Sequence, residues 1–214
     1  MDMTRKMGKG IVIVLSFVFV IAFAGCATVP PKSGFLSDYS KLHEDRYGKK
    51  SLLWWEKDSF DWRQYRKLML DPVIVHFHPE AKPRQIEPEA VKELIDYFRE
   101  AVEKELAAEY PIVTTPGPDV LRIRAAITEI IPANPAVNIV TTLAVFVPLD
   151  MGGAAIEAEF LDSQTNEVLA MMVDKNMASP VDLRFYRGFT TIGHAKGAIE
   201  AWAIELKKAL ETNP

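Results

Sequence analysis

Two histidines separated by one residue are the first candidates for chemistry. His76 and His78 lie in a stretch of alternating apolar residues, which predicts a strand. Residues two apart on a strand share a face, as the ligands of one metal ion must. Zinc needs three or four ligands, and Glu80 is the nearest candidate for a third. No spacing of Asp, Glu or Cys completes the set, so we expect solvated histidines on an edge strand and no metal.

Charged pairs on the predicted strands form a second set of candidates. Glu157 and Glu159 fall on one strand face and could act as an acid pair, but the sequence shows no substrate groove beside them. Arg122 and Arg124 also share a face and could bind an anionic partner. A solvated sheet face explains the two arginines more simply.

The motifs that mark nucleophilic or nucleotide chemistry are absent. The sequence contains no Gly-x-Ser-x-Gly elbow, no phosphate-binding loop and no Gly-x-Gly-x-x-Gly after a strand. His194 falls at the start of the last predicted helix, where it is interpreted as part of the cap, and 43–45 is a polar surface stretch. We therefore assign no catalytic or cofactor-binding residue and favour a protein that is not an enzyme.

Three tryptophans leave one enzymatic alternative open. Trp54, Trp55 and Trp62 cluster near the start of the chain and could stack on a glycan. Packing of an irregular N-terminal segment against the domain is the favoured interpretation. With the abundant carboxylates, the cluster keeps an envelope glycan or peptidoglycan hydrolase as the alternative function.

Composition narrows the class of protein. The 214 residues carry 25 Lys and Arg against 29 Asp and Glu, a net charge of −4, and 49% of them are apolar. This length and apolar content suit one domain with its own core, and the acidic balance argues against a nucleic-acid binder. The single cysteine excludes an internal disulfide and a cysteine-rich metal site.

The first 25 residues have the pattern of a secretory signal. Arg5, Lys6 and Lys9 precede an apolar run from Ile11 to Ala24. Fourteen helical residues span about 21 Å, which is less than the roughly 30 Å of a bilayer core. The run is therefore expected to be a cleaved signal and not a membrane-spanning anchor.

The end of this signal, Phe23-Ala24-Gly25-Cys26, resembles the lipobox of bacterial lipoproteins. The resemblance implies a diacylglyceryl thioether on Cys26, cleavage before it, and acylation of the new amine by a fatty acid such as palmitate. Ala27 in place of Asp implies sorting to the outer membrane. The expected organisation is a signal at 1–25, a lipidated tether at 26–33 and one periplasmic domain at 34–214.

Hydrophobic periodicity predicts the elements of that domain. A helix begins at Pro88, with an apolar stripe that includes Leu94 and Phe98, and it ends before Pro111. The other predicted elements are a strand over 67–78 interrupted at Asp71-Pro72, a strand at 120–131, a hairpin of 154–160 and 168–174, and a helix at 193–210. This order predicts an α+β two-layer sandwich, with helices on one face of a mainly antiparallel sheet whose other face is wet.

Residues 136–149 fit this scheme poorly because they are apolar without a clear period. Burial in the core is the favoured interpretation. The alternatives are a loop that touches the membrane, or an exposed partner or self-association surface. The candidate residues of such a surface are Val140, Leu143, Val145 and Phe146.

Four stretches of the mature chain resemble a family of uncharacterised Gram-negative lipoproteins, domain of unknown function 3313. They are 33–42, 65–73, 116–124 and 156–163, followed by Val168-Leu169-Ala170. Asn166 stands where this family is expected to have Gly in a hairpin turn, and Asn tolerates the same left-handed backbone. The resemblance implies no activity and no catalytic residue. It implies an architecture like that of small α+β modules in periplasmic assembly and secretion lipoproteins.

The expected function is therefore that of an outer-membrane-anchored periplasmic lipoprotein. Its partners would be the bilayer, through acylated Cys26, and an unknown envelope protein or a second copy of itself. The domain would bind or scaffold that partner without catalysis. Self-association through 136–149 is a further alternative to the hydrolase.

Overall fold

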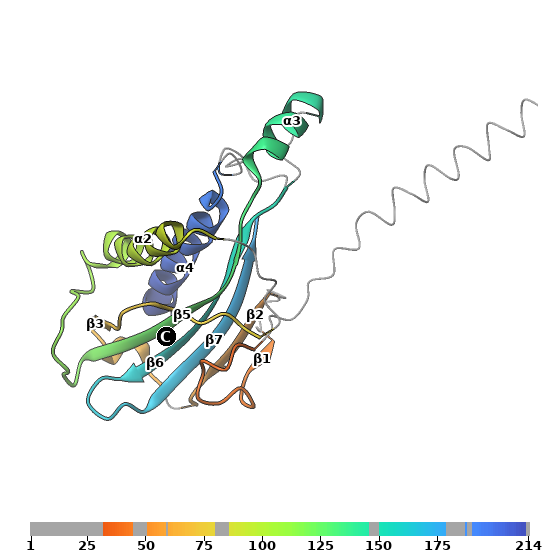
Figure 1. The fold of residues 1–214 in the computed structure, drawn as a ribbon. Helices are drawn as coiled ribbons and strands as arrows, with labels where there is room; N and C mark the ends of the chain where they lie inside the picture. Colours follow the sequence, from red (N-terminus) through yellow and green to blue (C-terminus); the bar gives the residue numbers. More distant parts are fainter. Residues whose placement is uncertain are drawn as a thin grey trace, which may run out of the picture.

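The computed structural model describes residues 32–44, 51–58, 60–79, 86–145, 150–178, 187 and 190–212. The predicted signal, Cys26, Glu80 and Phe146 lie outside these residues. The described part forms one mixed sheet with two long helices packed on it and a third, shorter helix beyond its end (Figure 1). The predicted α+β class is confirmed.

Seven strands make up the sheet. Its order is β1-β2-β7-β6-β5-β3, and β4 pairs with β5 off this path. The strands are β1 (His43–Glu44), β2 (Leu52–Glu56), β3 (Lys67–Leu70), β4 (Ile74–Val75), β5 (Val120–Ile131), β6 (Gly153–Asp162) and β7 (Val168–Met177). The long central strands β5, β6 and β7 are antiparallel, whereas β3 and β4 run parallel to β5. The break between β3 and β4 confirms the predicted interruption at Asp71-Pro72, since proline cannot donate to a ladder.

The two long helices cover one face of the sheet (Figure 1). Helix α2 (Pro88–Leu106) begins at the predicted proline, and its buried stripe contains Leu94, Phe98, Val102 and Leu106. Helix α4 (Gly193–Thr212) buries Ile199 and Trp202 in the same core. The predicted inner face of β5 meets them with Leu121, Ile123, Ala125 and Ile127. The apolar faces that the 3.6-residue helix period and the two-residue strand period predicted are thus buried in the structure.

The other face of the sheet is not wet, contrary to the prediction. Residues 33–42, called here the N-terminal segment, lie against it over β2, β6 and β7. Leu36 packs there with Leu53, Met171 and Val173 in a second, smaller cluster. Nine of the ten residues of β6 are consequently buried, on both of its faces.

The tryptophan region is more regular than predicted. Trp54 and Trp55 belong to β2, which pairs with β7 from Leu52 to Glu56. The buried Trp62 stacks on Trp54 with ring centroids 6.1 Å apart and meets Phe160 edge-on at 5.4 Å. The favoured interpretation, packing of these aromatic residues against the domain, is confirmed, although the segment is a strand and not irregular.

The β6–β7 hairpin turns through Asn166, whose φ of 59° is in the left-handed region expected there. Between β5 and β6 the chain forms helix α3 (Pro135–Val145), within the segment expected in the core. No helix among the described residues is long and apolar enough to cross a membrane.

Candidate interaction surface

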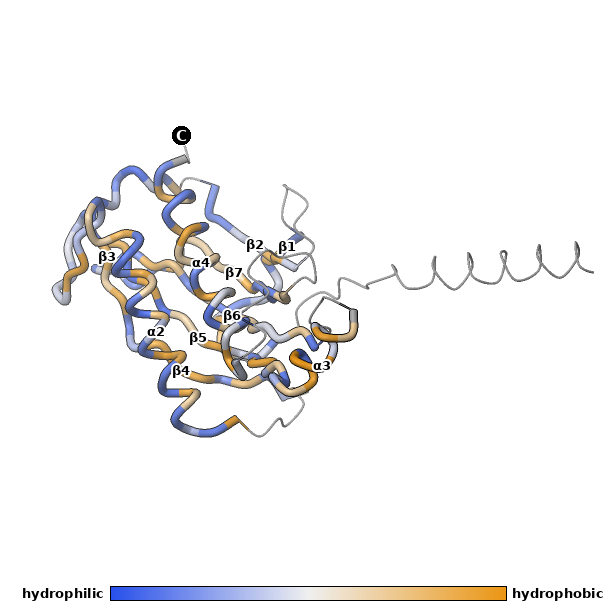
Figure 2. Tube along the Cα trace, turned by 90° about the horizontal axis from the view of Figure 1, so that it is seen from above, coloured by the Kyte–Doolittle hydropathy of each residue, from blue (hydrophilic) through white to orange (hydrophobic). Residues whose placement is uncertain are grey.

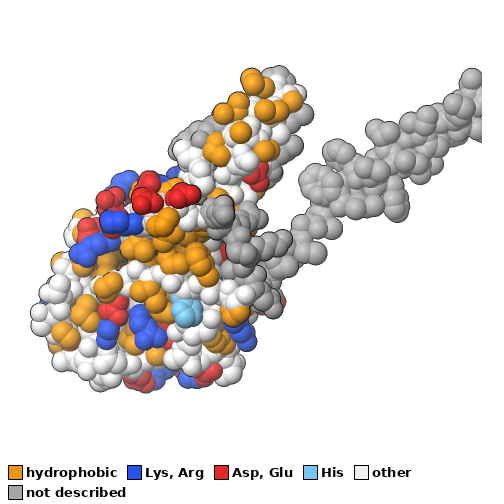
Figure 3. All heavy atoms as spheres, viewed as in Figure 1, with side chains coloured by type: hydrophobic (Ala, Val, Ile, Leu, Met, Phe, Trp, Pro, Cys, Tyr) orange, Lys and Arg blue, Asp and Glu red, His pale blue; other side chains and the backbone are white. Residues whose placement is uncertain are grey.

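Helix α3 is the most apolar exposed feature among the described residues. Val137, Ile139, Val140 and Leu143 are 43%, 50%, 65% and 79% exposed. In the space-filling view their helix projects from the body of the molecule with apolar side chains over its surface (Figure 3). In the view from above, much of the same element is coloured toward the hydrophobic end of the hydropathy scale (Figure 2). Core burial was therefore the wrong prediction for the apolar residues of this segment that are exposed, namely 136, 137, 139, 140, 143 and 144.

Three of the four candidate surface residues belong to this helix. Val140 and Leu143 are the two most exposed of its large apolar side chains. Val145 is the last residue of α3, and Phe146 lies outside the described residues. The residues named for a partner surface thus belong to one exposed helix as far as the structure describes them.

Polar contacts fix the base of α3 although its tip is apolar. The Asn134 side chain accepts hydrogen bonds from the backbone N–H groups of Ala136 (3.0 Å) and Val137 (3.2 Å), as a helix N-cap does. The fully buried Asn138 donates to the Asp150 carbonyl at 3.0 Å and accepts from the Asp150 amide at 2.8 Å. Asn138 near the start of α3 is therefore bonded to Asp150, which follows the helix in sequence. These contacts form a polar base that holds α3 away from the sheet.

A close backbone approach supports the same base. At Gly152 a Cβ atom would lie 2.7 Å from the Ile131 carbonyl, and at Gly153 it would lie 2.4 Å from the Asn176 carbonyl. Any larger residue would push the start of β6 away from its neighbours. The two glycines let the chain pass close to its neighbours where it enters the central strand β6.

The second candidate region is a pair of buried carboxylates under the N-terminal segment. Glu157 is fully buried and accepts hydrogen bonds from the Ser33 amide (2.8 Å), the Ser33 hydroxyl (2.8 Å) and the Tyr39 hydroxyl (2.5 Å). The Tyr39 hydroxyl in turn accepts from the amides of Gly34 (2.7 Å) and Leu36 (3.2 Å). Gly34 has a φ of +96°, which favours glycine.

Glu159, two residues along, completes this arrangement. It is 1% exposed, accepts from the Ser37 amide at 2.6 Å, and pairs with Arg124 at 2.7 Å. Burial and the hydrogen bond to Glu157 raise the pKa of Tyr39, which keeps its hydroxyl a donor. The carboxylates that could have been an acid pair are covered and used as hydrogen-bond acceptors. The contacts span 118 to 124 residues of sequence, so no local pattern could have revealed them.

The remaining charged candidates are satisfied in other ways. Arg122 forms a two-pronged contact with Asp71 at 2.9 and 2.8 Å, so neither predicted arginine faces an open anion site. His76 is exposed as predicted, but His78 is 7% exposed and was wrongly expected to be solvated. Within the described ranges, no group of three His, Cys, Asp or Glu residues is placed to hold a metal ion.

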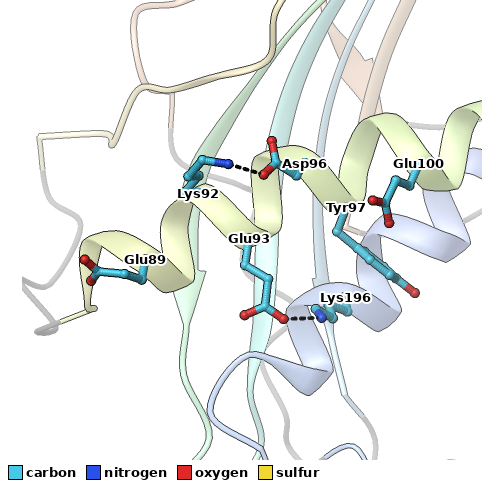
Figure 4. A pocket seen from close by; sticks show the side chains of 7 residues that line it. All are labelled: Glu89, Lys92, Glu93, Asp96, Tyr97, Glu100 and Lys196. Carbon is cyan, nitrogen blue, oxygen red and sulfur yellow. Dashed lines mark hydrogen bonds and ion pairs between the residues drawn. The ribbon is translucent and has the colours of Figure 1, made fainter.

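A charged hollow of about 400 Å³ lies between α2 and α4 (Figure 4). Its lining is Glu89, Lys92, Glu93, Asp96, Tyr97, Glu100 and Lys196. Lys92 pairs with Asp96 at 2.5 Å, and Lys196 pairs with Glu93. Burial, followed by the hydrogen bond to Glu200, raises the pKa of Tyr97 to about 12. Since both lysines are engaged and Tyr97 keeps its proton, the hollow offers surface ion pairs and no activated nucleophile.

One protein-family model matches most of this chain. The family model described as "Protein of unknown function (DUF3313)" matches residues 31–206. This chain belongs to that family. The predicted resemblance is confirmed, and the matched range begins just before the N-terminal segment and includes α3.

Curated relatives support a lipoprotein. "Uncharacterized lipoprotein YdcL" of Escherichia coli K12 is 34% identical over 117 residues, 52% of each chain, and the same protein of E. coli O157:H7 matches equally. The chain thus spans about half the length of the curated relatives it matches.

Solved structures with a similar chain path are distant in sequence. The PelC dodecamer of Paraburkholderia phytofirmans has a TM-score of 0.40 at 10% identity, over 70% of this chain and 93% of PelC. A DUF4136 family protein of Bacteroides thetaiotaomicron has a TM-score of 0.40 at 10% identity, over 74% of this chain and 96% of its own.

Proposed function

We propose that the protein is a periplasmic lipoprotein, anchored in the outer membrane through acylated Cys26, whose domain binds an envelope component without catalysis. The observation that carries the binding role is the exposed apolar face of α3, with Leu143 at its most exposed position. Burying a Val, Leu or Ile side chain contributes roughly 1.5–3 kcal/mol, so several at one exposed site favour a bound partner.

The anchor is supported by the sequence up to Cys26 and by the lipoprotein relative. A cysteine directly after a signal of this length is the required nucleophile for a thioether. Two or more acyl chains then give stable attachment, since each buried methylene contributes about 0.8 kcal/mol. Ala27 in place of Asp supports delivery to the outer membrane.

Fractionation of the native host tests the anchor. The Cys26→Ala chain is expected to accumulate as an uncleaved precursor and to be absent from the outer membrane. The Ala27→Asp chain is the matched control, because it should be processed normally but retained in the inner membrane. Normal processing and outer-membrane retention of the Cys26→Ala chain would refute lipidation at this residue.

A photoreactive amino acid at Val140 of the full-length lipoprotein tests the binding surface. It is expected to capture an envelope component, whereas the same group at Ile204, which is 41% exposed on α4, should capture nothing specific. A product of twice the monomer mass from Val140 would support the second candidate, self-association through α3, which the same exposed side chains favour. Equal yields from both positions would refute α3 as the binding element.

A further inference from the structure

We infer that the envelope component bound by α3 is the lipid bilayer itself, in the leaflet that holds the acylated Cys26. This inference rests on the proposed anchor and names the partner of the proposed surface. Three observations carry it: the direction in which the chain enters the domain, the reach of the tether, and the chemistry of the exposed face.

The first observation is that the chain enters the domain from the side of α3. Ser33 contacts Glu157 and Ser37 contacts Glu159, so the N-terminal segment runs in the same direction as β6. Strand β6 begins at Gly153, at the end of the sheet where α3 lies (Figure 1). Within the described residues, Ser33 therefore lies nearer that end of the sheet than Ser37 does.

The second observation is that the fully extended tether is shorter than the distance from Ser33 to the tip of α3. Ser33 lies four residues from the start of β6, about 13 Å along the strand. The eleven residues of α3 add about 16 Å beyond the sheet. The seven steps from Ser33 back to Cys26 span at most about 25 Å when fully extended. The tip of α3 is thus about 29 Å from Ser33. An acyl anchor on that side lies short of this tip, which brings the tip into the bilayer.

The third observation is the breadth and neutrality of the exposed face. Residues 136, 137, 139, 140, 143 and 144 are exposed and all apolar, and they cover about 160° of the helix circumference. No residue from 135 to 149 is charged. A protein groove receives a narrower set of anchors within a polar rim. A bilayer accepts a wide uncharged face and needs no such rim.

The backbone and length of α3 also suit entry into one leaflet. Up to its last turn, a helix satisfies its own backbone hydrogen bonds, as an apolar medium requires. The Thr141 hydroxyl donates to the Asn138 carbonyl at 3.3 Å. About 16 Å is half of the roughly 30 Å hydrocarbon core. The polar base at Asn134 and Asp150 would then remain at the interface.

Lipid quenching of a label on α3 tests the inference. The full-length acylated protein carrying Leu143→Cys is labelled with an environment-sensitive fluorophore and reconstituted into phosphatidylethanolamine–phosphatidylglycerol vesicles. Lipids with brominated acyl chains are expected to reduce emission about twofold or more, as for a side chain buried in the acyl boundary. The same label at Ile204→Cys is the matched control and should not respond.

Each other outcome overturns the bilayer as the partner. A label at 143 that is protected in native outer membranes but not quenched by brominated lipid identifies an envelope protein, and the proposed function survives. Protection that disappears when the protein is diluted in the vesicles identifies a second copy. A label exposed to water in both preparations refutes α3 as a binding surface as well, while processing of Cys26 separately decides the anchor.

Discussion

The N-terminal segment and α3 invert the usual distribution of polar and apolar residues. Under the N-terminal segment, two carboxylates are buried and fully supplied with donors. On α3, by contrast, four large apolar side chains are exposed. Burying a charge destabilises a protein unless it is hydrogen-bonded, and exposed apolar surface contributes nothing to folding. The first region therefore maintains the fold, whereas the second is explained only by contact with something outside the domain.

The largest expected effect lies under the N-terminal segment. Glu157→Ala removes the acceptor of three hydrogen bonds and leaves a cavity, so we expect a loss of roughly 3 kcal/mol in the free energy of unfolding. Urea denaturation of the purified protein measures it. Glu103→Ala is the matched control, because that carboxylate forms an exposed i,i+4 pair with Arg99 and should matter by less than about 1 kcal/mol. Equal losses would mean that the segment does not stabilise the sheet.

An intermediate effect is expected at Tyr39, whose hydroxyl joins the segment to Glu157. Tyr39→Phe removes one donated and two accepted hydrogen bonds and should lower the free energy of unfolding by roughly 1–2 kcal/mol near neutral pH.

The same substitution predicts a change in pH dependence. Burial and Glu157 raise the pKa of Tyr39 above its usual 10.0, so the native state keeps a proton that the unfolded chain releases. The contribution of protonated Tyr39 to the free energy of unfolding is fully present below pH 10 and declines as the pH rises above 10. The wild type should therefore lose more stability than Tyr39→Phe between pH 9 and 11, measured as the difference of urea midpoints. Parallel curves would show that Glu157 does not hold the Tyr39 proton.

The smallest effect is expected on α3. Leu143→Asp places a charge at a position that is 79% exposed, so the free energy of unfolding of the purified protein should change by less than about 0.5 kcal/mol. Thermal unfolding in the absence of membranes measures it. A loss comparable to that of Glu157→Ala would mean that α3 packs on the domain in solution, and the contrast between the two regions would fail.

Hydrophobic periodicity correctly predicted the elements whose buried faces are set by the spacing of nearby residues. Helix α2, strand β5 and the hairpin around Asn166 each follow from spacing within a few residues of sequence. The roles of Glu157 and Glu159 could not be predicted, because their partners lie more than a hundred residues away. The exposure of α3 was predicted only as an alternative to core burial, because an apolar run without a period resembles a core segment. Only its polar base at Asn138 and its projection from the sheet distinguish the two cases.

Thiol accessibility in intact outer membranes tests most directly that α3 is covered in the working protein. Isolated outer-membrane fragments, whose periplasmic face is open to the reagent, carry the Leu143→Cys or Ile204→Cys chain and are exposed to a membrane-impermeant maleimide before and after detergent extraction. We expect the thiol at 143 to be protected until the membrane is dissolved, and the thiol at 204 to react at the same rate throughout. Equal reaction of both thiols in the intact membrane would contradict the assignment of α3 as the contact surface.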